Sequence, residues 1–347
     1  MENLFKEFKP GTAAEWKAQL LKDLKGESPD QLTWENENGI SIAPYYTSED
    51  LQHTYEPAFT HADWQITGKA ENTDATVVSQ RLLRQLNQGA TSVEVNYTGE
   101  NYTTALKDIS LPHINAVFFV ARGKVTQLLD FLDKSYGLSN LNCSFFATDI
   151  QSENDGHDWL EKTSVLKSFT NLRAQSFNVL PFHNHGCVAQ YEIALALSGL
   201  AAFLSRDAGS MHPSAFTVKL GVNSDYFVQI AKLRALRRLW EVFKKELKLT
   251  NDLYVIAETS ITNKSLGDSH NNLLRTTVEA MAAVLGGCNE LVVNEFDVLF
   301  PGSSSLAERM AINQQLILKE ESYFDKMADV ACGSYFVESL TDALATQ

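Results

Sequence analysis

From residue 90 onward, short apolar or β-branched runs alternate with longer segments whose apolar residues recur at helical spacing. Such runs are typical of buried strands, and a period near 3.6 residues is typical of amphipathic helices. The predicted helices include 125–133, 189–205, 229–247, 271–285 and 306–321. The predicted strands are 92–97, 114–121, 143–148, 177–183, 216–223, 253–260, 291–296 and, from the weakest pattern, 327–332. These alternations predict an α/β fold of the (β/α)8 TIM-barrel type, with parallel strands buried on both faces.

A doubly wound open sheet is the alternative interpretation of the same alternation. It would be favoured by a Gly-x-Gly-x-x-Gly turn after the first strand, and the sequence has none there. Gly286 and Gly287 instead follow a predicted helix, where glycine commonly ends helices. We therefore expect a barrel over residues 51–347, preceded by an N-terminal helical arm over residues 1–50.

The arm has the pattern of an extension rather than of a strand–helix repeat. Thr12 can cap a helix that ends at Gly26. The apolar stripe of this helix consists of Trp16, Leu20, Leu21 and Leu24. Such a stripe either folds back on its own domain or wraps another subunit, and the pattern favours neither. The stretch 36–39 (NENG) predicts a turn between two short strands.

Composition and charge argue against some classes of function. A net charge of −14 and a pI near 5.0 disfavour a nucleic-acid or anionic-membrane binder, since both need clustered lysine and arginine. No apolar run approaches the length of a membrane span, and the first residues lack the apolar core of a signal peptide, so we expect a cytoplasmic or organelle-matrix protein.

The cysteines are too far apart for a metal site and are predicted to be buried free thiols: Cys143, Cys187, Cys288 and Cys332.

Candidate binding residues follow the predicted strands, because chemistry in a barrel gathers at the carboxyl ends of its strands. His183 and His185 could bind a metal or act as an acid–base pair, although ordinary loop hydrogen bonds are the commoner role. Glu258 ends another predicted strand and could bind a ligand at the mouth or cap the next helix. Asn294 begins a polar stretch that could hold an acid pair or be a solvated loop.

Four stretches resemble the barrel domain of methylmalonyl-CoA mutases, and the resemblance extends from about residue 45 to the end of the chain. They are 231–240 (AKLRALRRLW), 271–283 (NNLLRTTVEAMAA), 313–322 (NQQLILKEES) and 333–341 (GSYFVESLT). Because the stretches are long and occur in the family's order, the chain is identified as a member of that family.

The resemblance implies an adenosylcobalamin cofactor over the barrel mouth, an acyl-CoA threaded through the barrel, and rearrangement of methylmalonyl-CoA to succinyl-CoA. Phe59 stands where catalytic members have a tyrosine, and it lacks the hydroxyl. The acidic stretch 147–156 has no arginine to bind a substrate carboxylate. The family's histidine aligns with Pro181, or with His183 if the loop is two residues shorter. Glu258 replaces a glutamine of the catalytic chains.

A retained scaffold with altered site residues resembles the small, non-catalytic subunit of heterodimeric mutases. The resemblance implies that this chain stabilises a catalytic large subunit, holds no catalytic residue and binds no cofactor alone, with adenosylcobalamin bound in the holo-complex. Any residual mouth site would use Phe59, His183, His185, Glu258 and Asn294. Aromatic residues in 117–120 and 143–146 are expected to fill the barrel and close its tunnel. The alternatives are an active cobalamin-dependent acyl-CoA mutase and a free-standing acyl-CoA-binding barrel.

The family's cobalamin-binding domain is a separate C-terminal unit with an Asp-x-His-x-x-Gly signature. Asp268 and His270 match its first half, but the closing glycine is missing and the pair precedes a predicted helix. We therefore interpret Asp268 as a helix cap and expect the cobalamin-binding domain to be absent from this chain.

Overall fold

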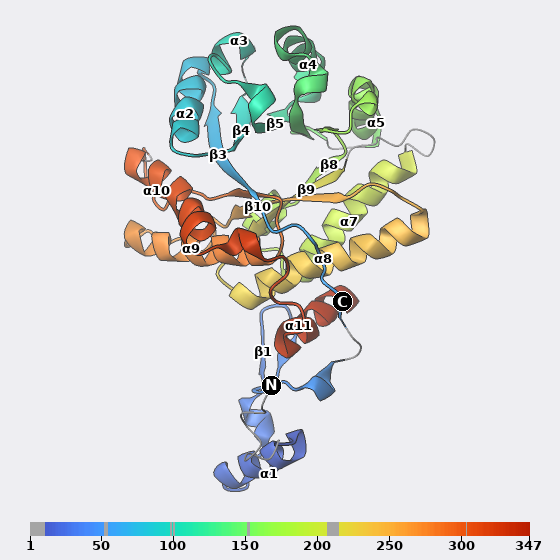
Figure 1. The fold of residues 1–347 in the computed structure, drawn as a ribbon, viewed down its shortest axis with the longest axis vertical. Helices are drawn as coiled ribbons and strands as arrows, with labels where there is room; N and C mark the ends of the chain where they lie inside the picture. The colour runs from blue at the N-terminus through green and yellow to red at the C-terminus, as the bar shows by residue number, and fades with distance from the viewer. Residues whose placement is uncertain are drawn as a thin grey trace, which may run out of the picture.

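The computed structural model describes residues 11–51, 55–97, 99, 101–150, 153–206, 215–302 and 304–347. A parallel sheet curls into a nearly closed barrel with helices outside it, which confirms the predicted TIM-barrel fold (Figure 1). The nine strands are arranged in the order β7-β6-β5-β4-β3-β11-β10-β9-β8. Their bounds are β3 Gln65–Asn72, β4 Ser92–Tyr97, β5 Asn115–Val120, β6 Asn142–Ala147, β7 Leu172–Arg173, β8 Ser176–Asn178, β9 Phe216–Val222, β10 Leu253–Thr259 and β11 Glu290–Val292.

Strands β7 and β8 together occupy one position of the eight-strand ring. Only Ala174 and Gln175 separate them along the chain. β7 pairs with β6, whereas β8 pairs with β9. β8 also lies close to β6, so this segment bridges the two edges of the sheet and leaves a seam between the carboxyl halves of β6 and β8.

The first strand of the barrel is β3, which precedes the first barrel strand predicted from the sequence, residues 92–97. β3 pairs with both β4 and β11. Residues 327–332, predicted to form the last strand, are instead turns, and both Met327 and Val330 are more than half exposed, so that prediction was wrong. β3 has a weak apolar pattern because Thr67 and Lys69 face the polar interior of the barrel.

The helices cover the outside of the barrel. The longer ones are α2 Ala75–Asn87, α4 Arg122–Tyr136, α5 Glu153–Lys162, α7 Ala189–Arg206, α8 Tyr226–Leu247, α9 Ser269–Leu285, α10 Ser305–Leu316 and α11 Tyr335–Thr346. The shorter α-helices are α3 Tyr102–Ala105 and α6 Leu180–Asn184, and a π-helical turn, Ile317–Glu321, follows α10. The 3₁₀ turns within the barrel domain are η3 Leu111–His113, η4 Leu138–Asn140, η5 Ser164–Ser168 and η7 Phe324–Lys326. Among the described residues, no helix combines the length and apolarity needed to cross a membrane.

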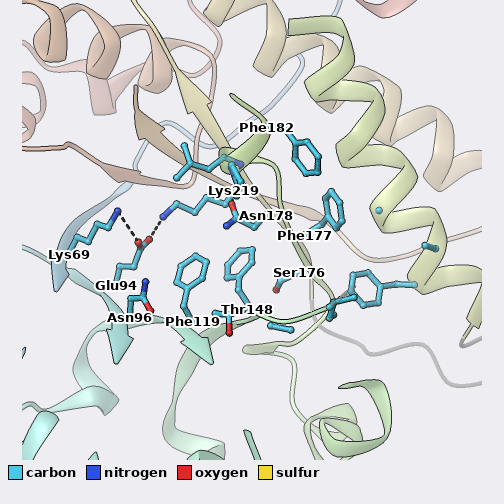
Figure 2. A pocket seen from close by; sticks show the side chains of 18 residues that line it. Lys69, Glu94, Asn96, Phe119, Thr148, Ser176, Phe177, Asn178, Phe182 and Lys219 are labelled. Carbon is cyan, nitrogen blue, oxygen red and sulfur yellow. Dashed lines mark hydrogen bonds and ion pairs between the residues drawn. The ribbon is translucent and has the colours of Figure 1, made fainter. Parts of the chain in front are cut away.

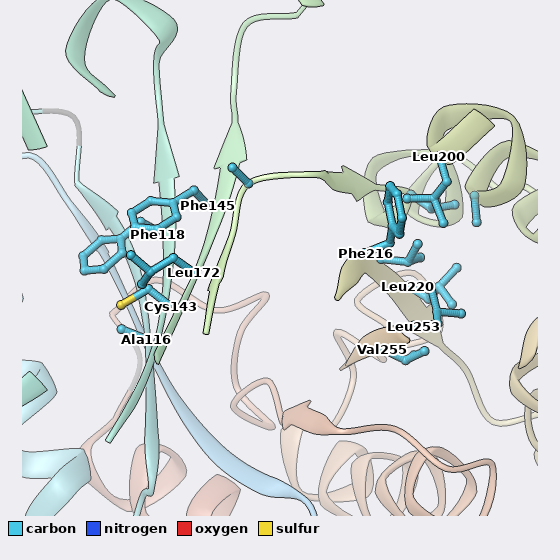
Figure 3. Packing of buried hydrophobic residues seen from close by; sticks show 14 of the residues in the cluster. Ala116, Phe118, Cys143, Phe145, Leu172, Leu200, Phe216, Leu220, Leu253 and Val255 are labelled. Carbon is cyan, nitrogen blue, oxygen red and sulfur yellow. The ribbon is translucent and has the colours of Figure 1, made fainter. Parts of the chain in front are cut away.

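The main core lies between the strands and these helices. Outward-facing side chains such as Phe118 and Phe145, whose rings stack with centroids 5.6 Å apart, pack beneath the helices. Figure 3 shows this group beside Cys143, and Phe216 with Leu220 in a second group. Cys143 and Cys288 are buried free thiols as predicted, whereas Cys187 and Cys332 are only partly buried.

The first helix of the N-terminal arm lies away from the barrel (Figure 1), whereas Ile40 and Ile42 of the arm are buried in the main core. Helix α1 (Ala13–Asp23) begins at the predicted cap, where Thr12 and Glu15 bond each other's backbone. No residue of α1 is buried. The 3₁₀ turns η1 (Pro29–Leu32) and η2 (Ser48–Asp50) flank a short antiparallel hairpin, β1 (Trp34–Glu35) and β2 (Ser41–Ile42), with the predicted turn between its strands. The hairpin contacts the barrel through Asn38, which accepts a hydrogen bond from the start of α7. Residues 1–10 of the predicted arm lie outside the described residues.

Candidate functional site

A cavity of about 850 Å³ lies at the carboxyl end of the barrel, beside the seam between β6 and β8. Residues of β3, β4, β5, β6, β8 and β9 and of helices α6 and α7 line it. Figure 2 shows Lys69, Glu94 and Lys219 along one side, and Phe177 and Phe182 on another. Because ligands of (β/α)8 proteins bind at this end of the barrel, the cavity is the candidate functional site.

Two lysines and two glutamates form what we call the charge cluster: Lys69, Glu94, Lys219 and Glu258. Lys219 Nζ lies 2.5 Å from Glu94 Oε2 and 2.6 Å from Glu258 Oε2. Lys69 Nζ lies 3.0 Å from Glu258 Oε1 and 3.9 Å from Glu94 Oε1. The side chain of Lys69 is 27% exposed, whereas the other three are at most 3% exposed. The cluster therefore combines four charges in a nearly dry environment.

Glu258 and Lys69 are held in the ionised state by the opposite charges around them. Burial acts to raise the pKa of Glu258, but Lys219 and Lys69 outweigh it and lower that pKa to about 2. Burial acts to lower the pKa of Lys69, but Glu258 and Glu94 outweigh it and raise that pKa. The two positive charges therefore compensate the two negative ones.

The ion pair between Lys219 and Glu94 crosses the barrel axis. Lys219 is on β9 and Glu94 is on β4. Three strands separate β9 from β4 in one direction (β10, β11 and β3), and β8–β7, β6 and β5 separate them in the other. The pair therefore joins opposite walls of the barrel, and Lys219 also lies over the Phe119 ring, 4.9 Å from its centroid.

Below this pair, further side chains fill the barrel. Inward-facing apolar residues form a buried cluster in the middle of the barrel, consisting of Val117, Phe146, Ile256 and Val292. Nearer the amino end, Asn115 donates a hydrogen bond of 3.2 Å to the Tyr254 hydroxyl. Their strands, β5 and β10, are also opposite each other. Tyr254 in turn donates to Glu290, whose pKa burial raises. Side chains thus meet across the axis at two levels.

Two of the predicted site residues come together beside the cavity. Asn294 follows β11, and its Nδ2 donates to Glu258 Oε1 over 3.1 Å and to the Thr259 carbonyl over 2.5 Å. Both Asn294 and Glu258 are buried. They therefore belong to one hydrogen-bonded network that includes the charge cluster.

His183 is buried in a separate network. Its Nδ1 lies 2.8 Å from Glu192 Oε1, and the other Glu192 oxygen pairs with Lys232 over 3.0 Å. Burial acts to raise the pKa of Glu192, but Lys232 and His183 outweigh it and lower that pKa. Within the described part of the chain, His183 Nε2 has no hydrogen-bond partner. The ring fits against Gly221, where an added Cβ would lie 2.1 Å from His183 Cδ2.

The other two predicted residues are not part of the cavity. His185 is exposed, and its Nδ1 lies 2.6 Å from the carbonyl oxygen of Pro181 in its own loop. Phe59 packs against Gly287, which precedes β11, and beneath the guanidinium of Arg237. Phe59 therefore lies at the amino end of the barrel, away from the mouth.

The predicted acidic stretch binds an arginine already present at the barrel's carboxyl end. Arg122, at the start of α4, lies within 2.7–3.5 Å of Asp149 and Asp155 of this stretch and of Asp158 just after it. Gln151 and Ser152 of the same stretch lie outside the described residues. The guanidinium of Arg122, which could otherwise bind an anionic ligand, is thus paired with three carboxylates.

Asp268 and His270, which match the first half of the cobalamin signature, form a helix cap and a ring stack instead of a cofactor site. Asp268 caps α9 by accepting a hydrogen bond from the His270 backbone, and the exposed His270 ring stacks on Phe296. Within the described ranges, no group of three or more His, Cys, Asp or Glu side chains could hold a metal ion. We therefore assign no step through cobalamin to this chain.

Sequence reasoning missed three members of the charge cluster. Lys219 is the one charged residue of the fully buried strand β9, which is a signal that could have identified it. Glu94 has a similar position in β4. Lys69 lies in β3, the strand that the pattern did not predict.

Comparisons with known proteins agree with the fold and with the sequence motifs. A protein-family model described as "Methylmalonyl-CoA mutase" matches residues 165–347. A "Methylmalonyl-CoA mutase small subunit" of Porphyromonas gingivalis is 29% identical over 391 aligned positions, covering 100% of this chain and 63% of that protein. A "Probable methylmalonyl-CoA mutase small subunit" of Mycobacterium tuberculosis is 36% identical, covering 50% of this chain and 30% of that protein. The "Methylmalonyl-CoA mutase, mitochondrial" of Bos taurus is 26% identical, covering 94% and 53%. The chain thus spans less than two thirds of each of these relatives.

Proposed function

The chain belongs to the methylmalonyl-CoA mutase family, and we propose that it is the barrel part of a small, non-catalytic subunit that supports a catalytic large subunit in a heterodimer. The observation that carries this proposal is the ion pair of Lys219 and Glu94 across the barrel axis. An acyl-CoA threaded along the axis would have to separate these two charges.

Separating them would be costly. Both side chains are at most 2% exposed, and breaking a buried pair by removing one partner typically costs about 3–5 kcal/mol. The second crossing, from Asn115 to Tyr254, and the apolar layer between the two crossings would also have to open. A filled axis therefore favours a structural subunit over an active mutase or a free-standing acyl-CoA binder.

The altered site residues support the same proposal. Phe59, the residue that aligns with the family's tyrosine, lies at the amino end of the barrel, so it supplies no polar group at the mouth. Arg122 is paired with three aspartates and so is not available for a substrate carboxylate. We infer that substrate capture, rearrangement and adenosylcobalamin binding take place on the catalytic partner.

The N-terminal arm is the proposed contact with that partner. Helix α1 buries none of its residues against the barrel. Large apolar side chains of the arm are exposed, with Leu21 at 45% and Trp34 at 58%. Obligate subunit interfaces often bury more than about 2,000 Å², and an apolar arm that wraps a partner would add to such an area. A cytoplasmic location remains a prediction from the sequence.

Co-expression with the large mutase subunit of the same organism tests the proposal. We expect the two chains to purify together, and mutase activity to require the large subunit and to rise or persist longer when this chain is present. The chain alone, given adenosylcobalamin and methylmalonyl-CoA, should produce no succinyl-CoA. Turnover by the isolated chain, or failure of the two folded chains to associate, would contradict the proposal.

A further inference from the structure

The mouth cavity has features that a purely structural subunit does not need. Phe119 lies on one side of it and Phe177 and Phe182 lie on another, so aromatic faces border the empty space (Figure 2). Its volume of about 850 Å³ is within the range of small-molecule pockets. Phe182 is 45% exposed, which leaves an apolar side chain at the rim. The cavity thus has the size and lining of a ligand site.

The charge of the cavity is balanced. Lys69 and Lys219 both line it, and each lies within 3.0 Å of a glutamate of the charge cluster. An anionic ligand would compete with Glu94 and Glu258 for these ammonium groups, and a cationic ligand would compete with the lysines for the glutamates. Desolvating a charged ligand without gaining a free counter-ion is unfavourable. The cavity therefore favours an uncharged ligand.

Unused hydrogen-bonding groups also line the cavity. Among the described residues, the side-chain amide of Asn96 and the hydroxyl of Thr148 have no hydrogen-bond partner, although both residues line the cavity. Asn178 uses its Oδ1 to accept from the Leu180 backbone, which leaves its Nδ2 available. Amide and hydroxyl groups are matched by amides, alcohols and similar neutral polar groups.

We propose that this cavity binds an uncharged small molecule with a flat apolar body and an amide- or hydroxyl-type polar end. The body packs between Phe119 and the pair Phe177 and Phe182, and the polar end bonds to Asn96 or Asn178. The ligand enters from the mouth and stays there, because the charge cluster closes the axis below it. This site is independent of the proposed subunit role.

Three isosteric probes test the proposal by calorimetric titration of the full chain: 2-naphthamide, 2-naphthoate and 2-naphthylmethylammonium. We expect 2-naphthamide to bind at least about tenfold more tightly than either charged probe. Asn96→Leu and Asn178→Leu should each weaken naphthamide binding several-fold. Asn87→Leu, the same change at an exposed position on α2, should leave binding unchanged.

Changing the charge balance provides a second test. Glu94→Gln leaves one lysine charge uncompensated and should shift the preference toward 2-naphthoate. If that variant does not fold, Lys69→Met, at the one partly exposed member of the cluster, should shift it toward the ammonium probe. Tightest binding of naphthoate by the unaltered chain, equal binding of all three probes, or no binding of naphthamide at millimolar concentration would overturn the proposal.

Discussion

Lys219 Nζ and Glu94 Oε2 lie 2.5 Å apart across the barrel axis, although their residues are 125 positions apart in the chain. The pair ties β9 to β4 and places two charges where a family member that threads its substrate would need open space. Because this pair closes the axis, replacing either residue should change the stability of the barrel.

Lys219→Met should destabilise the chain by about 3–5 kcal/mol, because it leaves Glu94 and Glu258 with only the partly exposed Lys69 to pair with. Urea unfolding followed by circular dichroism measures the change. Lys107→Met, at an exposed position, should alter the free energy of unfolding by less than about 0.5 kcal/mol. A Lys219→Met variant as stable as this control would show that the pair adds little to the barrel.

Arg234→Met should be equally disruptive. Arg234 is fully buried on α8 and donates hydrogen bonds to Asp329, Glu338 and Thr341, which joins α8 to α11 and to the preceding turn. Removing the guanidinium leaves the buried Asp329 carboxylate without this counter-ion and Glu338 with Arg238, and we expect a loss of about 3–5 kcal/mol together with faster amide exchange in α11. The matched change Arg309→Met, on the exposed face of α10, should have little effect on either measurement.

Stability should fall on mild acidification because of His61. Burial, followed by the charge of Arg237, lowers the pKa of His61 to about 4, against 6.5 for the free side chain. Between these values the unfolded chain binds a proton that the folded chain does not, so the free energy of unfolding decreases as pH falls from 6.5 toward 4. Above pH 6.5 the residue contributes no pH dependence.

His61→Gln tests this assignment. Glutamine keeps a donor for the Gly287 carbonyl, which lies 3.1 Å from His61 Nε2, but it does not titrate. The slope of unfolding free energy against pH between 4 and 6.5 should therefore decrease relative to the unaltered chain. An unchanged slope would assign the acid sensitivity to other groups.

Because His183 packs closely against Gly221, adding a single methyl group at Gly221 should destabilise the folded chain. In Gly221→Ala the new methyl group would lie 2.1 Å from His183 Cδ2 and must displace the ring from Glu192. Overpacking of this kind typically costs about 1–3 kcal/mol. Gly123→Ala, in α4 with no atom near the added Cβ, should instead raise the melting temperature slightly. Equal melting temperatures for the two variants would contradict this account.

The sequence predicted much of the fold because helix periodicity in regions such as α8 is local. It also placed Glu258 and Asn294 near each other, since parallel strands end at the same edge of the barrel. It could not predict the charge cluster, because pairing of Lys219 with Glu94 depends on the register and closure of the whole ring. The strand predicted over residues 327–332 was wrong because Met327 and Val330, although apolar, are exposed rather than buried.

The arm provides the last prediction, on partner binding rather than on stability. Because α1 buries none of its residues and Trp34 is 58% exposed, Leu21→Asp and Trp34→Asp should leave the melting temperature of the isolated chain nearly unchanged. If the arm wraps the catalytic subunit, the same changes should weaken heterodimer formation at least about tenfold, because each buries a charge in an apolar contact. Analytical ultracentrifugation or surface plasmon resonance measures that affinity. Leu274→Asp, on the exposed face of α9, distinguishes a contact through the arm from one through the barrel. Weakening by Leu274→Asp alone would place the interface on the barrel wall and leave the arm without its proposed role.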